Sequence, residues 1–273
     1  MKRRPLRFGF STLGCPAAEL EAIVALARRH RLPAIELRAL AGSIDLVAQL
    51  RARFGEPARL AAWRQEHAGD LDFPVVDASF RLSDGDDEAF AALWELAPWA
   101  EALGGRWLRV FDGPAATEAE GLRRCAARAA AWSEFQSEQG CRVGLAVETH
   151  DSVLDAAGIS RLLDAAPKLR VVWDAYHTWA RGGEDPRVTW SDSASAIVHI
   201  HIKDGIRRSA APEHPPYVPP GAGEFPGKPL LDGLVSGNFS GAVVLEWERL
   251  WHPGFAPLDE ALLAAEAAWF SER

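Results

Sequence analysis

Eight short runs of apolar or β-branched residues recur along the chain, and each has the length of a buried strand. Longer segments between them repeat their apolar residues at helical spacing. The eight candidate strands are residues 6–13, 34–40, 73–82, 107–113, 143–150, 169–178, 197–204 and 241–248. The clearest candidate helices are residues 17–32, 88–104, 120–140, 159–166 and 258–272.

The strand-like and helical segments alternate from one end of the chain to the other. This order is typical of right-handed β–α–β units, which build a parallel sheet. Eight such units are the number that closes a (β/α)8 barrel, and no linker divides the series into two parts. The pattern therefore predicts an α/β protein with a single TIM-barrel domain over residues 1–273.

One segment breaks the alternation. Residues 205–225, GIRRSAAPEHPPYVPPGAGEF, contain five prolines, and a helix cannot run through them. The segment follows the seventh strand, so it leaves from the C-terminal mouth of the barrel, where such barrels carry their active sites. Loops this long inside compact domains are usually functional or disordered. We expect a Pro-rich active-site loop at about 205–225, against the alternative of a surface loop without function.

Composition and charge disfavour several classes of protein. The 273 residues are 48% hydrophobic and 25% charged, with a mean hydropathy of −0.10, which is typical of a globular chain. The net charge of −8 disfavours a nucleic-acid partner, and no apolar stretch approaches the length of a membrane span. Cys15, Cys125 and Cys141 show no disulfide or zinc-site spacing, so we expect a cytoplasmic protein.

Acidic residues and histidines gather at the ends of the last four candidate strands. Side chains of a strand point alternately to its two faces. In the fifth strand, the apolar Leu145 and Val147 suit the outer face beneath the helices, which turns Glu148 into the barrel. The same parity gives each later strand an inward polar group near its end. The strand-end residues are Glu148 and His150, Asp174 and His177, His199 and His201, and Glu246 and Glu248.

Several carboxylates at one barrel mouth would repel one another and raise their own pKa values unless a cation neutralised them. A metal ion is the simplest such cation. Carboxylates with one imidazole suit Mn²⁺, Mg²⁺ or Co²⁺, with Zn²⁺ as a further choice, and they do not suit a structural zinc. Any one of these residues alone would be explained by an ordinary salt bridge or by packing. Four successive strands with such groups favour one divalent ion.

Five motifs, in order, carry a resemblance to a known family: VETH (147–150), WDAYH (173–177), HIHIKD (199–204), GAGEFP (221–226) and VVLEWE (243–248). Over essentially its whole length, the sequence resembles the xylose isomerase-like barrel superfamily of sugar isomerases, ketose 3-epimerases, inosose dehydratases and isomerases, and, more distantly, endonuclease IV. The resemblance implies four metal ligands: Glu148, Asp174, His201 and Glu246. It also implies that His177 touches substrate oxygens, that His199 lies behind the ligands, and that Arg207 matches a substrate-binding arginine.

The first half of the chain departs from the endonuclease branch, which needs additional histidines to hold three zinc ions. The second and third strands offer Glu36, Asp77 and Ser79 but no histidine, and with the acidic charge this disfavours DNA repair. Arg109 is a further candidate for the pocket. Glu36 and Arg38 share a strand face, so they are either pocket residues or partners of each other.

These residues predict a divalent-metal-dependent isomerase or epimerase that acts on a sugar, ketose or keto-inositol through an enediolate intermediate. The metal would hold a carbonyl oxygen and the neighbouring hydroxyl oxygen of the substrate. Glu148 and Glu246 would transfer the proton, from opposite faces of the substrate in an epimerase. The candidate substrate-binding residues are His177, Lys203, Arg207, Arg109 and Tyr217.

Two other functions stay open at this point. A metal-dependent dehydratase or lyase of a keto-polyol would use the same enediolate, and a polyol-binding barrel would have no turnover. The expected partner is a small polyhydroxylated carbonyl compound, with no nucleic acid and no membrane. The sequence leaves the substrate, the native metal and the oligomeric state open, a homo-oligomer included.

Two further assignments are also left open. Lys203 either polarises a substrate oxygen or pairs with Asp204. The four tryptophans near the site either form an apolar wall or belong to the core; they are Trp173, Trp179, Trp247 and Trp251.

Overall fold

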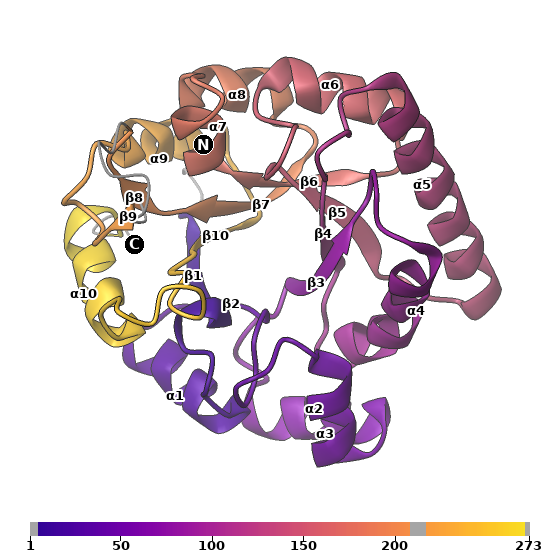
Figure 1. Ribbon diagram of the computed structural model, residues 1–273. Coiled ribbons are helices and arrows are strands. Elements are labelled where there is room, and N and C mark those ends of the chain that lie inside the picture. Colours follow the sequence, from indigo (N-terminus) through magenta and orange to yellow (C-terminus); the bar gives the residue numbers. More distant parts are fainter. Residues whose placement is uncertain (1–4, 208–216, 271–273) are drawn as a thin grey trace.

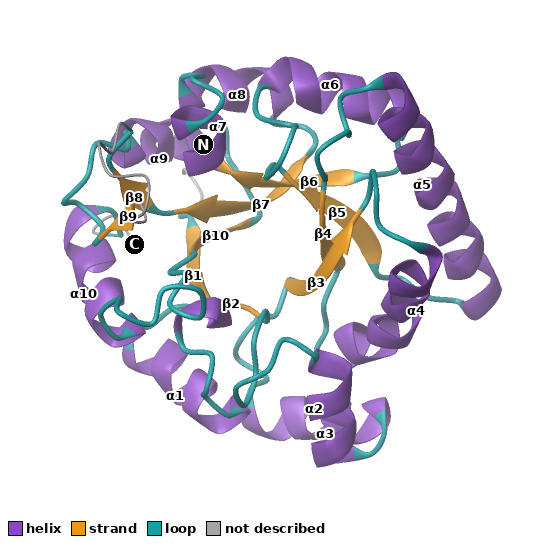
Figure 2. Cartoon of the chain, in the orientation of Figure 1, coloured by secondary structure: helices purple, strands orange, loops and turns teal. Residues whose placement is uncertain are grey.

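The structure is a computed structural model that describes residues 5–207 and 217–270. Eight parallel strands form a ring at the centre of the molecule, with the helices outside it (Figures 1 and 2). Each strand lies within one of the eight predicted runs. The strands are β1 (Arg7–Ser11), β2 (Ala34–Glu36), β3 (Val75–Arg81), β4 (Trp107–Phe111), β5 (Gly144–Glu148), β6 (Arg170–Asp174), β7 (Ile197–Ile202) and β10 (Ala242–Leu245).

The order of the strands closes the ring. Neighbouring strands run β2-β1-β10-β7-β6-β5-β4-β3 in one sheet, and every pair in it is parallel. Parallel bridges between Leu37 and Val76 and between Ala34 and Asp72 then join β2 to the chain around β3. The predicted (β/α)8 TIM barrel is confirmed.

Within residues 5–207 and 217–270, the five predicted helices are present, with their ends shifted by a few residues, and five further helices were not predicted. The predicted helices are α1 (Leu20–Arg29), α4 (Asp87–Ala102), α5 (Ala119–Gln139), α6 (Ala156–Ala165) and α10 (Leu258–Ala268). The additional ones are α2 (Leu46–Phe54), α3 (Pro57–His67), α7 (Ala175–Ala180), α8 (Pro186–Ser193) and α9 (Gly227–Ser236), and a 3₁₀ turn, η1, spans Thr12–Gly14. The helix α3 buries only Leu60, which explains its weak sequence pattern.

The predicted sixth strand, residues 169–178, is wrong in its second half. The strand ends at Asp174, whose side chain accepts a hydrogen bond from the backbone N–H of His177 at 2.8 Å and so caps α7. An aspartate at the N-cap satisfies one of the free N–H groups of a first helical turn. The D-x-x-H motif is therefore also the start of a helix, which places Asp174 and His177 at the same corner.

The inner face of the barrel changes from apolar to charged along the strands. Two small groups of buried residues, separate from the main core, occupy inward positions: Ala34, Ala242 and Val244, and Val75, Ala146 and Val172. Toward the C-terminal ends, the same parity continues into Glu36, Asp77, Glu148 and Asp174. The outward Leu145 and Val147 belong to the main core between sheet and helices, as the parity predicts.

Close approach of the strands requires a glycine at position 9. A Cβ atom there would lie 2.2 Å from the carbonyl oxygen of Ala34 on the neighbouring strand. Such a contact is well inside van der Waals distance, so a larger residue would push β1 away from β2. Gly9 thereby allows the strand that carries Glu36 to sit close to β1.

The part of the Pro-rich segment that the structure describes is tied to the end of β7. Two strands of two residues each, β8 (Asp204–Gly205) and β9 (Tyr217–Val218), pair with each other in antiparallel orientation. The carboxylate of Asp204 accepts backbone N–H groups from Gly205, Gly221, Gly223 and Phe225. Residues 208–216 of the predicted loop lie outside the described residues. In the described part of the chain, the helices are too short or too polar to cross a membrane.

Candidate metal centre

Four buried side chains from four strands converge at the C-terminal mouth of the barrel. Each offers one donor atom, and these atoms all lie within 4.8 Å of one another. They are the four that the family resemblance implies as ligands: Glu148, Asp174, His201 and Glu246. All four are at most 5% exposed. The arrangement supports a mononuclear metal site, and ligation itself stays a prediction.

Strand register brings these side chains together. Asp174 pairs with His201 between β6 and β7, and His201 pairs with Val244 between β7 and β10. Glu246 follows two residues after Val244 and so points to the same side. Glu148 ends β5, next to β6. Because all the strands are parallel, their ends meet at one edge of the barrel.

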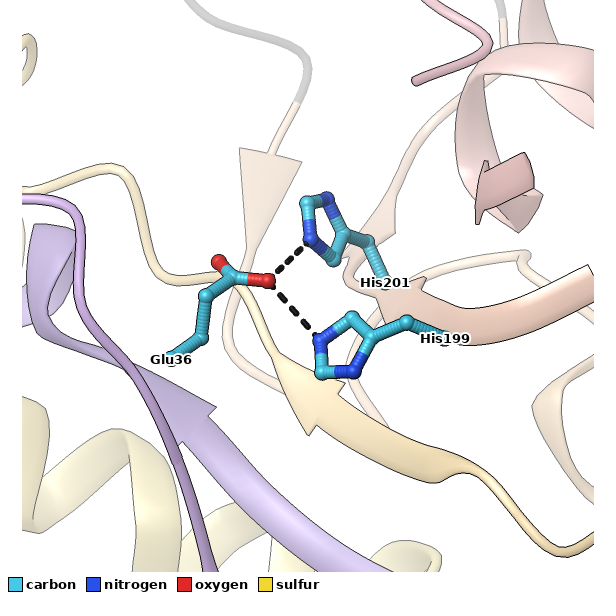
Figure 3. A group of neighbouring side chains, drawn as sticks. All are labelled: Glu36, His199 and His201. Carbon is cyan, nitrogen blue, oxygen red and sulfur yellow. Dashed lines mark hydrogen bonds and ion pairs between the residues drawn. The ribbon is translucent and has the colours of Figure 1, made fainter. Parts of the chain in front are cut away.

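His201 and His199 both point toward the carboxylate of Glu36 (Figure 3). The Nδ1 atom of His201 faces Glu148 Oε1 at 3.4 Å and Glu246 Oε2 at 3.5 Å. Its Nε2 atom lies 2.6 Å from Glu36 Oε2, and His199 Nε2 lies 2.8 Å from the same oxygen. A histidine whose far nitrogen donates to a carboxylate presents a lone pair on its near nitrogen, as metal-binding histidines do.

The predicted alternative that Glu36 pairs with Arg38 is wrong. Glu36 turns into the barrel toward the two histidines, whereas Arg38 donates from Nη2 to Ser79 Oγ at 3.0 Å. His199 shares the Glu36 oxygen with His201 (Figure 3), and the place behind the ligands that the resemblance implies for it stays a prediction. The partner of Glu36 is thus a histidine pair on a strand that does not adjoin β2.

Two cations hold the candidate glutamates from opposite directions. Arg109 Nε lies 3.1 Å from Glu148 Oε2, and Arg109 also donates to Asp77 Oδ2 at 2.7 Å. Lys203 Nζ pairs with Glu246, with Asp174 Oδ2 at 2.9 Å and with Glu248 Oε1 at 2.6 Å. The alternative that Lys203 pairs with Asp204 is wrong, because the oxygens of Asp204 bind the backbone of the Pro-rich segment.

The charges shift the pKa values of the site in different directions. Burial raises the pKa of Glu148 and Glu246, but Arg109 and Lys203 respectively outweigh it and keep both pKa values below the usual range. Burial raises the pKa of Asp174 to about 6 against the opposing charge of Lys203. Burial disfavours a charged His201, but Glu36 more than compensates and raises its pKa well above the usual value. In this state His201 carries a proton that a cation would replace.

The donor atoms themselves fit a metal ion. Glu148 Oε2, Asp174 Oδ2 and His201 Nδ1 are buried, and within residues 5–207 and 217–270 they accept or donate no hydrogen bond of normal geometry. Glu148 Oε2 and Asp174 Oδ2 face the cationic side chains of Arg109 and Lys203. Buried His201 Nδ1 faces the other oxygen of Glu148 at 3.4 Å without a hydrogen bond, and buried polar atoms are nearly always satisfied, so a cation fits at this position. Three carboxylates and one imidazole form an oxygen-rich set that suits a divalent ion.

His177 and Tyr217 lie at the rim of the cluster. His177 Nδ1 is 3.2 Å from Asp174 Oδ2, and His177 Nε2 is 3.4 Å from the hydroxyl of Tyr217. Burial, together with the charge of Lys203, lowers the pKa of His177 well below its usual value, so the ring is neutral. The Lys203 Nζ atom lies 5.3 Å from the centroid of the Tyr217 ring. The described end of the Pro-rich segment therefore reaches the site.

Arg207 is placed differently from the other predicted substrate-binding residues. It is exposed, and its guanidinium lies over the ring of Trp179, 5.3 Å from the centroid. The structure therefore does not bring Arg207 into the cluster, and its role stays a prediction. Of the four tryptophans, Trp173, Trp179 and Trp247 belong to the main core, whereas Trp251 is 50% exposed.

The sequence reasoning missed Asp112, which fixes the loop after Glu148. Its carboxylate accepts the backbone N–H groups of Asp151, Ser152 and Val153 at 2.6–2.8 Å. Asp112 also lies near His150 and Asp151 in a group with metal-ligand spacing. Because its oxygens already serve three N–H groups, we assign it a structural role. Its position directly after β4 is the only sequence signal for it.

Comparisons with known proteins agree with the fold. A family model described as "Xylose isomerase-like TIM barrel" matches residues 17–273. The search of curated proteins finds no match. Many solved structures share the fold, among them the probable 3-DHS dehydratase AsbF from Bacillus anthracis, with 17% identity, a TM-score of 0.75, and coverage of 98% of this chain and 100% of that one.

Two other solved structures are similar to the chain. The IolI protein with a zinc atom has 17% identity, a TM-score of 0.73 and coverage of 96% of both chains. D-psicose 3-epimerase in the presence of D-fructose has 13% identity, a TM-score of 0.70, and coverage of 96% of this chain and 99% of that one. At these identities the likeness shows the fold alone.

Proposed function

Because the chain belongs to the xylose isomerase-like TIM barrel family, we propose that it is a divalent-metal-dependent isomerase or epimerase of a sugar, ketose or keto-inositol. One observation carries the proposal. Donor atoms of Glu148, Asp174, His201 and Glu246 lie within 4.8 Å of one another at the barrel mouth, with cations held behind them. A site of this kind suits the deprotonation of a carbon next to a carbonyl group.

Those four residues would hold one divalent ion, with Mn²⁺, Mg²⁺ or Co²⁺ favoured by the oxygen-rich set and Zn²⁺ as the further choice. When bound, the ion supplies a positive charge beside the substrate oxygens on which negative charge develops. Glu36 and His199 orient His201 so that its Nδ1 faces the ion site.

Glu148 and Glu246 are the proposed proton-transfer groups. Arg109 and Lys203 keep their pKa values low, so both glutamates are ionised at neutral pH and can accept a proton. In the epimerase version one glutamate removes the proton and the other returns one from the opposite face. In the isomerase version one of them suffices, and the other acts as a ligand only.

The proposed contacts to substrate oxygens are His177, whose ring is neutral, the charged Lys203 and Tyr217. They surround the candidate ligands from one side: His177 touches Asp174 and Tyr217, and Lys203 touches Asp174 and Glu246. Arg109 acts behind Glu148. We retain the segment at 205–225 as an active-site loop and Arg207 as a substrate contact that would need to move inward.

A metal-dependent dehydratase of a keto-polyol is the second candidate, since the chain resembles the probable dehydratase AsbF as well as the epimerase in fold. Both reactions begin with removal of the same kind of proton, and the substrate decides whether a hydroxyl group then leaves. A polyol-binding barrel without turnover is the remaining alternative. A single domain over residues 1–273, a cytoplasmic location, the absence of a nucleic-acid partner and the oligomeric state stay predictions.

Proton exchange tests the proposal directly. Purified protein is incubated in D₂O with a panel of ketoses and keto-inositols, before and after treatment with a chelator. An isomerase, epimerase or dehydratase places deuterium from solvent on the substrate or product only with metal present, whereas a binding protein does not. Mass loss of water marks the dehydratase. Full exchange by metal-free protein would contradict the proposed metal dependence.

The variants Glu148→Gln and Glu246→Gln then assign the bases. Glutamine keeps the size and one acceptor oxygen but loses the basicity. In an epimerase each variant still exchanges the proton of one epimer while interconversion stops, whereas a one-base enzyme loses exchange in only one variant. Glu184→Gln is the control, because Glu184 bonds the backbone of Ala156 and the hydroxyl of Thr189, away from the site. Normal turnover in both site variants would exclude these glutamates from catalysis.

A further inference from the structure

Arg38 carries a buried charge without an ion-pair partner. The residue follows β2 at the barrel mouth and is only 3% exposed. Its Nη2 atom donates to Ser79 Oγ at 3.0 Å, whereas Nη1 has no hydrogen bond. Among the described residues, no carboxylate oxygen lies within the 4.0 Å that defines an ion pair with this guanidinium.

The acidic groups near Arg38 have other partners. Asp77 and Glu148 both pair with Arg109. Glu36 Oε2 lies in contact with the Nε2 atoms of His199 and His201. Burial and the neighbouring charge of Arg109 lower the pKa of Arg38 to about 10. The guanidinium is therefore still charged at neutral pH. The charges of Asp77, Glu148 and Glu246 act on it favourably without forming an ion pair, and burial with the like charge of Arg109 outweighs them.

Such a group is unfavourable for folding alone. An uncompensated buried charge costs several kcal/mol, and a buried arginine is normally paired with a carboxylate. Proteins tolerate this loss of stability mainly where the group serves binding or catalysis. The planar fork of an arginine matches the oxygens of a carboxylate or a phosphate, whereas a neutral hydroxyl leaves its charge uncompensated.

Two exposed side chains border Arg38. Ser79, its hydrogen-bond partner, is exposed at the end of β3 and keeps a hydroxyl proton to donate. Trp251 is 50% exposed, and its ring centroid lies 6.0 Å from Arg38 Cζ. The charges of Glu148 and Glu246 act on Arg38, so the group lies beside the candidate metal centre.

We propose that Arg38, with Ser79, binds an anionic substituent of the substrate, a carboxylate or a phosphate, beside the candidate metal centre. The inference rests on the proposed function, since it narrows the substrate from neutral sugars to acidic polyhydroxylated carbonyl compounds. The anion would supply the charge partner that the Arg38 guanidinium lacks. Bound at this point, it would fix the distance between the acidic end of the substrate and the four candidate ligands.

Simple anions test the site without substrate or turnover. Metal-free protein is titrated with acetate and with inorganic phosphate at constant ionic strength, and the melting temperature is compared with that in chloride. We expect one of the two anions to stabilise the wild type, and the larger effect identifies carboxylate or phosphate as the source. The variant Arg38→Met should lose this stabilisation, and Arg38→Lys should retain part of it. Equal responses of wild type and Arg38→Met would overturn the proposal.

Stability separates this role from a structural one. In chloride, Arg38→Met should be at least as stable as the wild type, because a charge without a partner is removed. A markedly lower melting temperature would show that Arg38 supports the fold, and it would also overturn the proposal. The control is Arg51→Met, since Arg51 on α2 pairs with Glu95 on the outer surface. That variant should respond to anions as the wild type does.

Sugars with and without an acidic group extend the test to ligands of the proposed class. D-glucuronate and D-glucose 6-phosphate are compared with D-glucose by calorimetry on metal-free protein. A charge-assisted hydrogen bond contributes enough for about 10–100-fold tighter binding than that of D-glucose. We expect this gain for D-glucuronate if the site binds carboxylate, and for D-glucose 6-phosphate if it binds phosphate. Arg38→Met should remove that preference. No preference for either acidic sugar, or a preference that survives in Arg38→Met, would count against the proposal.

Failure of this inference and failure of the proposed function give different results. In one case, neutral ketoses exchange their proton in a metal-dependent way, but Arg38 has no effect on anion binding. The proposed function then stands, and the anion site is excluded. In the other case, anion binding depends on Arg38, but the protein binds no metal and exchanges no proton. The anion site then stands, and the proposed function is excluded.

Discussion

Replacement of Glu36 by glutamine tests whether the carboxylate behind His201 prepares the site for a metal ion. Glu36 is fully buried, and its Oε2 atom holds His201 at 2.6 Å and His199 at 2.8 Å (Figure 3). The variant Glu36→Gln keeps the shape and one acceptor oxygen but removes the negative charge. The prediction rests on the proposed metal centre.

The structure sets the expected size of the effect. A hydrogen bond to a charged group contributes about 1.5–3 kcal/mol and a neutral one about 0.5–1.5 kcal/mol, so the hydrogen bond between His201 and Glu36 should weaken by about 1 kcal/mol. That hydrogen bond acts directly on a candidate ligand, and the close contact of His199 Nε2 with the same oxygen, at 2.8 Å, is weakened as well when the charge is removed. We therefore expect metal binding to weaken by about 1–2 kcal/mol, or about 5–30-fold in Kd.

Calorimetric titration of metal-free protein with Mn²⁺ or Co²⁺ measures this change. The visible spectrum of bound Co²⁺ adds a readout of ligand geometry, which a general loss of stability would not alter. Glu184→Gln serves as the matched control, because Glu184 lies outside the site. Folded Glu36→Gln protein with an unchanged Kd and an unchanged Co²⁺ spectrum would refute the idea that Glu36 orients His201.

Other predictions concern the metal, the loop after β5 and the cysteines. Chelation of the ion should lower the melting temperature in a concentration-dependent way, since a ligand at 100 times its Kd adds about 2.7 kcal/mol of stability. Asp112→Ala should lower the free energy of unfolding in urea by about 2–4 kcal/mol, because three backbone N–H groups lose their acceptor, and Asp112→Asn should lose less. Burial raises the pKa of Cys125 to about 12, so at pH 8 a disulfide reagent should label the less buried Cys141 well before Cys125; rapid labelling of native Cys125 would contradict its burial.

The barrel and the inward glutamate of β5 could be predicted from the sequence because both depend on local pattern. Apolar runs separated by amphipathic segments give the order of the elements, and alternation along a strand decides that Glu148 and Val147 face opposite sides. The helix α3 could not be predicted in this way, because it buries little besides Leu60. The pattern also extended the predicted sixth strand over residues that form α7, since the apolar residues after Asp174 fit either a strand or a helix.

The partners of the charged residues could not be predicted, because they depend on positions across the barrel. Glu36 reaches His199 and His201 on β7, although β1 and β10 lie between β2 and β7 in the sheet. Parity alone placed Glu36 and Arg38 on one face and suggested that they pair. In the folded chain the two histidines take the carboxylate, and Arg38 turns to Ser79.

The two candidate bases differ in how firmly their cations are held. Arg109 is fixed by Asp77 Oδ2 at 2.7 Å and by the carbonyl oxygen of Ala78 at 3.2 Å, and its Nε lies 3.1 Å from Glu148 Oε2 as an ion pair without a hydrogen bond. Lys203 has a flexible stem and three carboxylate partners, of which Glu248 lies farthest toward solvent with a side chain that is 15% exposed. An ion between Glu246 and Asp174 would repel the ammonium group, which can shift toward Glu248 without losing its charge partner. We therefore expect the cation beside Glu148 to keep its place and the cation beside Glu246 to move when an ion and a substrate bind.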